Sequence, residues 1–268
     1  MLLTIDAGNT RTKWGLFDEA GAMLEHGACL NTNLEKMQVP AVSRVIISNV
    51  AGEKVKTQLE KILANNTQTN VQIKWLSAQA SACGIINHYE KPETLGSDRW
   101  AALIAAWHIK QASCVVVNAG TAVTIDALSV ADQHSQAAFI GGVILPGLTL
   151  IRQSLASATA QLPAKLQETS VQKTPLQELL TQPQNVFAKN TADAIHAGSL
   201  LAISGAIILM ERALNTQCKQ APVIVISGGD AQLIKDSLNG SVTNSVIIID
   251  NLVLQGLYLL EKLMPPDI

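Results

Sequence analysis

The chain has 268 residues, of which 48% are hydrophobic and 15% are charged, and its formal net charge is −2. This length and apolar content are enough to bury the core of one large or two ordinary domains, which excludes an intrinsically disordered protein. The near-neutral net charge shows no excess of positive charge that would attract nucleic acid or an anionic membrane surface. We therefore expect neither as a partner, and an anionic ligand must be held by local groups.

Three sequence features favour a cytoplasmic location. The N-terminal residues lack the basic start, apolar stretch and small-residue cleavage site of a secretory signal. The four cysteines form no CxxC pair and no metal-ligand spacing, so reduced thiols are expected. The most apolar helix candidate, Ala197–Leu209, is interrupted by Ser204 and Gly205, and we expect it to be too short to span a bilayer.

The N-terminal part of the chain alternates strand patterns with a helical pattern. Short apolar or alternating runs predict strands, whereas apolar residues spaced three and four apart predict a helix. Strands are expected at residues 2–5, 12–17, 44–50 and 72–76, and a helix at residues 53–64. This alternation is typical of an α/β architecture.

A segment in the middle of the chain repeats the pattern of the N-terminus. The strand at 114–117 leads into Asn118-Ala119-Gly120-Thr121, much as the strand at 2–5 leads into Asp6-Ala7-Gly8-Asn9-Thr10. A second strand follows each turn, at 12–17 and at 123–128. We interpret these as two homologous halves, residues 1–112 and 113–268. The second half is expected to contain a polar loop at 161–184, a strand at 222–227 and a closing helix at 252–263.

The two glycine turns are candidate phosphate-binding loops. A turn with Gly next to Asn or Thr can direct backbone N–H groups at an anion, and Gly8 allows close approach because it has no Cβ. Thr10, Thr12 and Lys13 can add donors, and the oxygen ligands of Asp6 suit Mg²⁺. For one such loop, a plain hairpin with Asp6 capping the turn is the better reading. Two loops in matching places favour phosphate binding.

The form of these loops indicates a particular kind of nucleotide site. The chain has no GxxxxGK[ST] motif, and no GxGxxG opens a helix after a strand. Paired hairpin loops of this kind resemble those of the superfamily of actin, Hsp70 chaperones and sugar kinases. That resemblance implies two similar actin-like or Hsp70-like (ribonuclease H-like) α/β domains with a nucleotide cleft between them.

A second constellation lies between Tyr89 and Trp100, where Gly96-Ser97-Asp98-Arg99 opens a helical pattern. Asp98 could accept the proton of an attacking hydroxyl, and Arg99 could make a two-pronged contact with a carboxylate. An N-capping Asp98 with a surface Arg99 is at least as good a reading of these two residues alone. Tyr89 alone reads as a partly buried packing residue.

Taken together, these motifs resemble the ordered signatures of type III pantothenate kinases. Further matching segments continue the family's order along nearly the whole chain. The matching segments are Asp6–Thr10, Tyr89 with Leu95–Trp100, Ala119–Asp126, Gly141–Gly147, Asn190–Ile195, Ser227–Asp230 and Asn251–Leu257. Each motif is modest, but their ordered combination is highly specific.

The resemblance implies ATP-dependent phosphorylation of pantothenate to 4'-phosphopantothenate, the first step of coenzyme A biosynthesis. It implies Asp98 as the catalytic base, Asp6 as the Mg²⁺ ligand and Gly228–Asp230 near the nucleoside. The implied ATP contacts are Asp6, Ala7, Gly8, Asn9, Thr10, Arg11, Thr12, Lys13 and Thr121. The implied pantothenate contacts are Tyr89, Gly96, Ser97, Asp98, Arg99 and Thr191. The resemblance further implies a homodimer whose acceptor pocket lies at the interface, with Thr191 reaching across.

One position departs from the family pattern. The family's second loop begins with an Asp that is associated with a monovalent cation such as K⁺ or NH₄⁺, whereas this chain has Asn118. An amide oxygen can coordinate K⁺ but brings no negative charge, so we expect weak or absent activation. Two other functions stay open: a kinase for another small hydroxyl acceptor, and a non-catalytic regulatory accessory factor of the same family.

Overall fold

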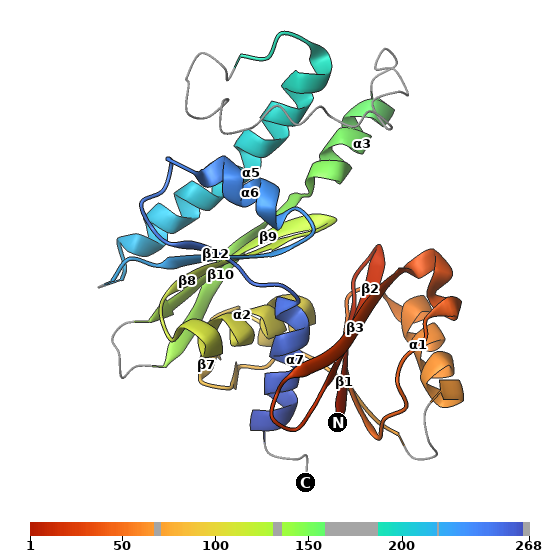
Figure 1. Ribbon diagram of the computed structural model, residues 1–268. Helices are drawn as coiled ribbons and strands as arrows, with labels where there is room; N and C mark the ends of the chain where they lie inside the picture. Colours follow the sequence, from red (N-terminus) through yellow and green to blue (C-terminus); the bar gives the residue numbers. More distant parts are fainter. Residues whose placement is uncertain (67–70, 131–135, 159–186, 219, 265–268) are drawn as a thin grey trace. The chain divides into compact units, whose positions relative to one another are not determined.

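The chain forms two compact α/β units, shown in Figure 1, a computed structural model that describes residues 1–66, 71–130, 136–158, 187–218 and 220–264. The first unit contains Met1–Gln111, Gln136–Ile140 and the C-terminal residues from Asn251, and the second contains the rest. The expectation of a loop at residues 161–184 lies outside the described residues. The expected boundary near residue 112, and a nucleotide cleft, stay predictions.

The first unit is built on a five-stranded sheet with strand order β3-β2-β1-β4-β5. The strands are β1 (Leu2–Ala7), β2 (Arg11–Phe17), β3 (Met23–Leu30), β4 (Arg44–Asn49) and β5 (Gln72–Trp75). Strands β1 to β3 pair antiparallel, whereas β4 and β5 continue the sheet in parallel. The central strands β1 and β4 are almost wholly buried, as their apolar sequences predict.

Helices cover this sheet and connect its strands. They are α1 (Glu53–Asn66), α2 (Ser97–Lys110), α7 (Leu252–Leu263) and the short 3₁₀ helices η1 (Asn31–Lys36) and η2 (Pro92–Thr94). Figure 1 shows α7 beside α2, and α7 also packs against β1. A Cβ at Gly256 would overlap the carbonyl oxygen of Ala101, so glycine allows the backbones of α7 and α2 to come this close.

The second unit repeats the topology of the first. Its strands are β8 (Cys114–Ala119), β9 (Ala122–Val130), β10 (Ala137–Pro146), β11 (Val223–Gly228) and β12 (Val246–Ile248). Their order, β10-β9-β8-β11-β12, corresponds to the order of the first sheet. In both units an antiparallel hairpin is extended by two parallel strands. This correspondence supports the interpretation of two homologous halves.

The helices of the second unit are α3 (Leu148–Ala158), α5 (Thr191–Asn215) and α6 (Ala231–Leu238). Helix α5 packs against β8, β9, α3 and α6, and its apolar side chains complete the core of the unit. In the first unit, the beginning of β10 pairs with β7 (Ile85–Asn87), which in turn pairs with β6 (Ser81–Ala82). The strand β7 leads directly to Tyr89.

The expectation that the apolar helix is too short to span a bilayer is wrong. Helix α5 has 25 residues, and an 18-residue window within it has a mean hydropathy of 1.6, with 33% of the window buried. The helix begins early because Asn190 caps it, its Oδ1 accepting a hydrogen bond from the Asp193 N–H. Ser204 does not interrupt it, since its hydroxyl pairs with that of Ser237 on α6. Core helices of globular proteins also reach this length and hydropathy.

Candidate functional site

Two carboxylates converge at the carboxyl end of strand β1. Asp6 is the penultimate residue of β1 and Asp98 lies in the first turn of α2. Burial, and next the negative charge of Asp98, raise the pKa of Asp6 to about 7, although the nearby Lys13 ammonium opposes the shift. Ser48 pairs with Asp6 in the sheet, and its hydroxyl bonds to that of Ser97, the residue before Asp98. The first unit therefore brings together two residues that lie 92 positions apart in the sequence.

The local geometry at the start of α2 holds the Asp98 carboxylate. Its Oδ1 accepts a hydrogen bond of 2.8 Å from the Arg99 N–H. A Cβ on Gly96 would lie 2.6 Å from the same oxygen, so glycine leaves the space that the carboxylate occupies. Burial raises the pKa of Asp98, while the Arg99 N–H and the Arg99 charge act in the opposite direction. A carboxylate with a raised pKa is a stronger base than a carboxylate whose pKa has its ordinary value.

Aromatic rings hold the Arg99 guanidinium on the same helix turn. Arg99 is buried, and its Nη1 donates a hydrogen bond of 2.9 Å to the Tyr89 hydroxyl. The guanidinium lies 5.6 Å from the centroid of the Tyr89 ring and 5.8 Å from that of Phe139, which is itself fully buried. A guanidinium held in this way is pre-oriented for a substrate carboxylate.

Two polar residues that the sequence analysis did not single out support this arrangement. Asn87 is buried at the end of β7, where its Oδ1 accepts the Tyr89 N–H and its Nδ2 donates to the carbonyls of Gln79 and Pro92. Ser48 lies directly beside Asp6 in the parallel pairing of β4 with β1. Both follow apolar strand residues, and a polar residue at a strand end is the signal that could have identified them.

The turn between β1 and β2 contains the residues expected to contact ATP. Asn9, Thr10 and Arg11 are exposed, and Lys13 lies opposite Asp6 in the hairpin register. Thr12 instead is fully buried, and its hydroxyl donates to the Asn31 Oδ1 at 2.9 Å. The Thr12 hydroxyl therefore holds the turn in place, and a contact between it and ATP stays a prediction.

The corresponding turn of the second unit lies between β8 and β9. The Thr121 carbonyl accepts the Gly147 N–H at 2.9 Å, and a Cβ on Gly147 would overlap the Gly120 carbonyl oxygen. Gly228 has a φ of +110°, and a Cβ there would overlap the Ala119 carbonyl oxygen. Glycine is thus required at both positions where neighbouring backbone meets this turn. Asn118, half-buried, precedes the turn.

Two further positions of the second unit belong to the predicted site. Thr191 is exposed at the first residue of α5. Asp230 precedes α6, and burial raises its pKa while the Arg152 charge lowers it. The first unit thus contains Asp6, Asp98, Arg99 and Tyr89, and the second contains Asn118, Thr121, Thr191 and Asp230.

The residues present suit a cation that is coordinated partly by the protein and partly by the phosphates of a nucleotide. No group of three or more His, Cys, Asp or Glu side chains that could hold a metal occurs among the described residues. Mg²⁺ in nucleotide sites needs only one or two carboxylates, because phosphates and water supply the other ligands. Burial, and next the Asp98 charge, raise the pKa of Asp6, and a bound cation would favour its ionised form. Asp6 therefore fits such an ion.

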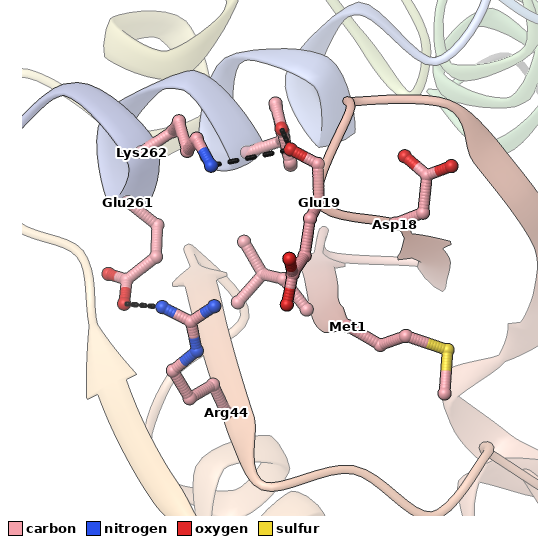
Figure 2. Close-up of a pocket in the computed structure, with 8 residues that line it drawn as sticks. Met1, Asp18, Glu19, Arg44, Glu261 and Lys262 are labelled. Atoms are coloured by element: carbon pink, nitrogen blue, oxygen red, sulfur yellow. Dashed lines mark hydrogen bonds and ion pairs between the residues drawn. The ribbon is translucent and has the colours of Figure 1, made fainter.

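A surface hollow of the first unit lies away from this site (Figure 2). It is lined by Met1, Leu2, Asp18, Glu19, Arg44, Tyr258, Glu261 and Lys262. Figure 2 shows the Arg44–Glu261 ion pair and the hydrogen bond from Lys262 to the Glu19 carbonyl. Leu2 begins β1, whereas Asp6 lies four residues further, roughly 13 Å along an extended strand. The hollow is therefore at the opposite end of β1 from the paired carboxylates.

Comparison with known proteins gives matches over nearly the whole chain. A family model described as type III pantothenate kinase matches residues 2–213. A protein of Methylobacillus flagellatus named type III pantothenate kinase is 39% identical over 266 residues, covering 98% of this chain and 99% of that protein. One of Janthinobacterium sp. with the same name is 39% identical over 274 residues, covering 96% of each chain.

Solved structures share the fold at low sequence identity. A conserved putative Baf family transcriptional activator from Campylobacter jejuni has a TM-score of 0.56 and 20% identity, with 97% of each chain covered. A putative N-acetylmannosamine kinase from Listeria monocytogenes has a TM-score of 0.52 and 14% identity, covering 97% of this chain and 98% of that chain. These likenesses confirm the expected fold of the actin, Hsp70 and sugar-kinase superfamily.

Proposed function

The chain belongs to the type III pantothenate kinase family, and we propose that it phosphorylates pantothenate with Asp98 as the general base. The activity of the family is the ATP-dependent phosphorylation of pantothenate to 4'-phosphopantothenate, the first step of coenzyme A biosynthesis. ATP and a divalent metal ion are required for this reaction. The observation that carries the residue assignment is the hydrogen bond between Ser97, which precedes Asp98, and Ser48, which pairs with Asp6, since it brings both carboxylates to the same end of β1.

In the proposed mechanism, the Asp98 carboxylate accepts the proton of the pantothenate hydroxyl while that oxygen bonds to the γ-phosphorus. The bond between the γ-phosphorus and the bridging oxygen breaks, and ADP leaves with the bond's electron pair. Arg99, held by Tyr89, binds the pantothenate carboxylate and orients the hydroxyl. Gly96 and Ser97 shape the pocket around Asp98.

The turns after β1 and β8 are the proposed phosphate contacts. The backbone N–H groups of Asn9, Thr10 and Arg11, together with Lys13 and Thr121, stabilise the negative charge of the phosphates. Mg²⁺, held by Asp6 directly or through water, would neutralise phosphate charge when it is bound with ATP. The Asn118 position would bring no charge to a monovalent cation, so K⁺ or NH₄⁺ should activate weakly or not at all.

The direct test compares wild type with Asp98→Asn in an assay of ADP release from Mg-ATP, with and without pantothenate. General-base catalysis typically contributes 10²–10⁴-fold, so we expect kcat to fall by about that factor in the variant. Glu53→Gln, which neutralises an exposed carboxylate on α1, is the matched control and should retain activity. Equal turnover in Asp98→Asn would remove Asp98 from this role. If wild type binds Mg-ATP but shows no turnover, the regulatory alternative is favoured. If wild type releases ADP only with another alcohol as acceptor, the alternative kinase function is favoured.

We also propose a homodimer in which Thr191 contributes to the acceptor pocket of the partner. Exposed apolar side chains in the second unit support an interface there, namely Val143, Ile144, Leu150, Leu201 and Leu209. Mixing Asp98→Asn with an inactive Thr191→Trp protein should restore partial activity, since a mixed dimer has one intact pocket. A monomer in analytical ultracentrifugation, or no recovery from a demonstrated mixed dimer, would contradict this arrangement.

We propose a cytoplasmic location, which suits a family of bacterial metabolic enzymes. Helix α5 would supply apolar contacts to the core of the second unit and to the dimer rather than to lipid. Cell fractionation should leave the protein in the high-speed supernatant. Recovery in membranes after a high-salt and carbonate wash would contradict this location.

A further inference from the structure

Asn31 binds the turn between β1 and β2 through both ends of its side-chain amide. Its Nδ2 donates to the Gly8 carbonyl at 2.7 Å and to the Asn9 carbonyl at 3.2 Å. Its Oδ1 accepts the hydroxyl of the buried Thr12 at 2.9 Å. In addition, the Asn31 N–H donates to the Thr10 carbonyl at 3.0 Å. One residue at the start of η1 thus binds three consecutive carbonyls of the turn.

These contacts set the direction of the backbone N–H groups. In a trans peptide group the C=O and the following N–H point in opposite directions, and the group is planar. The carbonyls of Gly8, Asn9 and Thr10 are directed at Asn31. The N–H groups that share these peptide planes, those of Asn9, Thr10 and Arg11, therefore point away from Asn31. A set of successive N–H groups on one side of a turn is a concave site for an anion.

The carbonyls of Gly8 and Asn9 fix which end of the Asn31 amide faces the turn, because carbonyl oxygens can only accept hydrogen bonds. The Oδ1 end then faces the fully buried Thr12, whose hydroxyl donates to it and holds the side chain in place. The opposite orientation would place an amide oxygen against carbonyl oxygens and would cost the hydrogen bonds. The Asn31–Thr12 pair therefore holds the turn in a single arrangement before a ligand binds.

We propose that Asn31 is a positioning residue that orients the phosphate-binding N–H groups of the first turn toward ATP. The inference rests on the proposed binding of ATP at this turn. Asn31 itself acts through the backbone and does not touch the nucleotide. Its loss should therefore weaken the binding of the triphosphate while leaving the pantothenate pocket, which Tyr89 and Arg99 form, unaltered.

The test is the affinity of the full-length protein for Mg-ATP, measured by calorimetry without pantothenate, for wild type and Asn31→Ala. Loss of the amide contacts should raise the dissociation constant about tenfold, which corresponds to about 1.4 kcal/mol. The KM for Mg-ATP should rise in parallel, whereas the KM for pantothenate should change less than about twofold. Asn33→Ala, an exposed residue on the same 3₁₀ helix, is the control and should match wild type.

Asn31→Asp tests the loss of the NH₂ donor while the volume of the side chain stays the same. It keeps the shape and one acceptor but replaces the NH₂ donor with an oxygen, so it should weaken Mg-ATP binding at least as much as Asn31→Ala. Asn33→Asp controls for the added negative charge. Wild-type affinity in Asn31→Asp, or equal losses for ATP and pantothenate, would overturn the positioning role.

Circular dichroism and melting temperature show whether the variants fold. If Asn31→Ala is unfolded, Thr12→Val provides the second variant, because it removes the buried hydroxyl that anchors the amide Oδ1. It should give a smaller loss of Mg-ATP affinity in the same direction, and unchanged affinity would overturn the proposal. Mg-ATP binding is measured without turnover. A wild-type protein that binds Mg-ATP but does not phosphorylate pantothenate would therefore contradict the proposed function and leave this test intact.

Discussion

The side-chain hydroxyl groups of Ser48 and Ser97 form a buried hydrogen bond of 2.8 Å. Ser48 lies beside Asp6 in the sheet, and Ser97 immediately precedes Asp98 at the start of α2. This contact ties the helix turn that carries one carboxylate to the strand next to the other. A hydrogen bond between two uncharged residues therefore links the two segments that carry the carboxylates.

Replacing Ser48 by Ala should reduce both stability and turnover. The buried Ser97 hydroxyl would lose its partner, which costs about 1–3 kcal/mol of unfolding free energy. A small displacement of Asp98 should lower kcat by roughly tenfold. Urea unfolding and steady-state kinetics measure the two effects, with the exposed Ser154→Ala on α3 as control. An unchanged kcat in a destabilised variant would show that this contact is structural only.

The raised pKa of Asp6 predicts that the ligand-free protein loses stability as the pH rises. The folded protein binds the Asp6 proton more tightly than the unfolded chain, whose pKa is 3.8, so the contribution is complete below that value. It is lost as the pH rises through about 7. The raised pKa of Asp98 acts in the same direction.

Urea unfolding of wild type and Asp6→Asn between pH 4 and pH 8 measures this effect. The unfolding free energy of Asp6→Asn relative to wild type should increase with pH. The increase should be on the order of 2 kcal/mol, because solvent reaches part of the carboxylate and screens the repulsion. A constant difference across this range would contradict a raised Asp6 pKa.

Tyr89→Phe tests the orientation of Arg99. The variant keeps the ring that packs against Phe139 but removes the hydroxyl that accepts from Nη1. We expect the KM for pantothenate to rise roughly fivefold, since Arg99 loses one fixed contact, with the KM for ATP unchanged. Tyr258→Phe removes the hydroxyl that donates to the Glu19 carbonyl at the distant hollow and should behave like wild type. A rise in the KM for ATP instead would place Tyr89 elsewhere in the reaction.

Much of the fold follows from local pattern, and the proposed catalytic residues follow from motif. Apolar runs identified the central strands, and the helical spacing of α1 and α7 identified those helices, because burial on one face imposes a period. The repeated strand, glycine turn and strand revealed the two similar units. The family resemblance supplied the proposed roles of Asp6, Asp98 and Arg99, which local pattern alone left open.

The supporting residues could not be predicted in the same way. Ser48, Asn87, Phe139 and Asn31 act through partners on other elements, so their functions depend on strand register and side-chain direction. The start of α5 was missed because the Asn190 cap lies seven residues before the apolar run that marked the helix. Long-range contacts of this kind are visible only once the chain is folded, whereas the Asn190 cap has a local sequence signal that lies outside the apolar run.

Gly256→Ala should be strongly destabilising, because its methyl group would overlap the Ala101 carbonyl oxygen and force α7 away from α2. Overpacking of this kind costs about 1–3 kcal/mol, and the shift of α2 should also lower kcat. Thr57→Ala, at an exposed position of α1, is the control. It should stabilise the protein by up to about 0.7 kcal/mol through helix propensity. Equal melting temperatures for the two variants would contradict the close helix contact.

Asn118→Asp tests why this chain should respond weakly to monovalent cations. Asn118 is half-buried at the end of β8, between Thr124 of β9 and Ser227 of β11 in the sheet register. A carboxylate there would add the negative charge that attracts a hard cation to oxygen ligands. Wild-type turnover should change less than about twofold when Na⁺ is replaced by K⁺ or NH₄⁺, whereas Asn118→Asp should be activated about fivefold or more, a gain of about 1 kcal/mol. Steep activation of the wild type by K⁺ would show that the amide oxygen already suffices, and an Asn118→Asp protein that folds but stays indifferent to the cation would remove this position from any cation site.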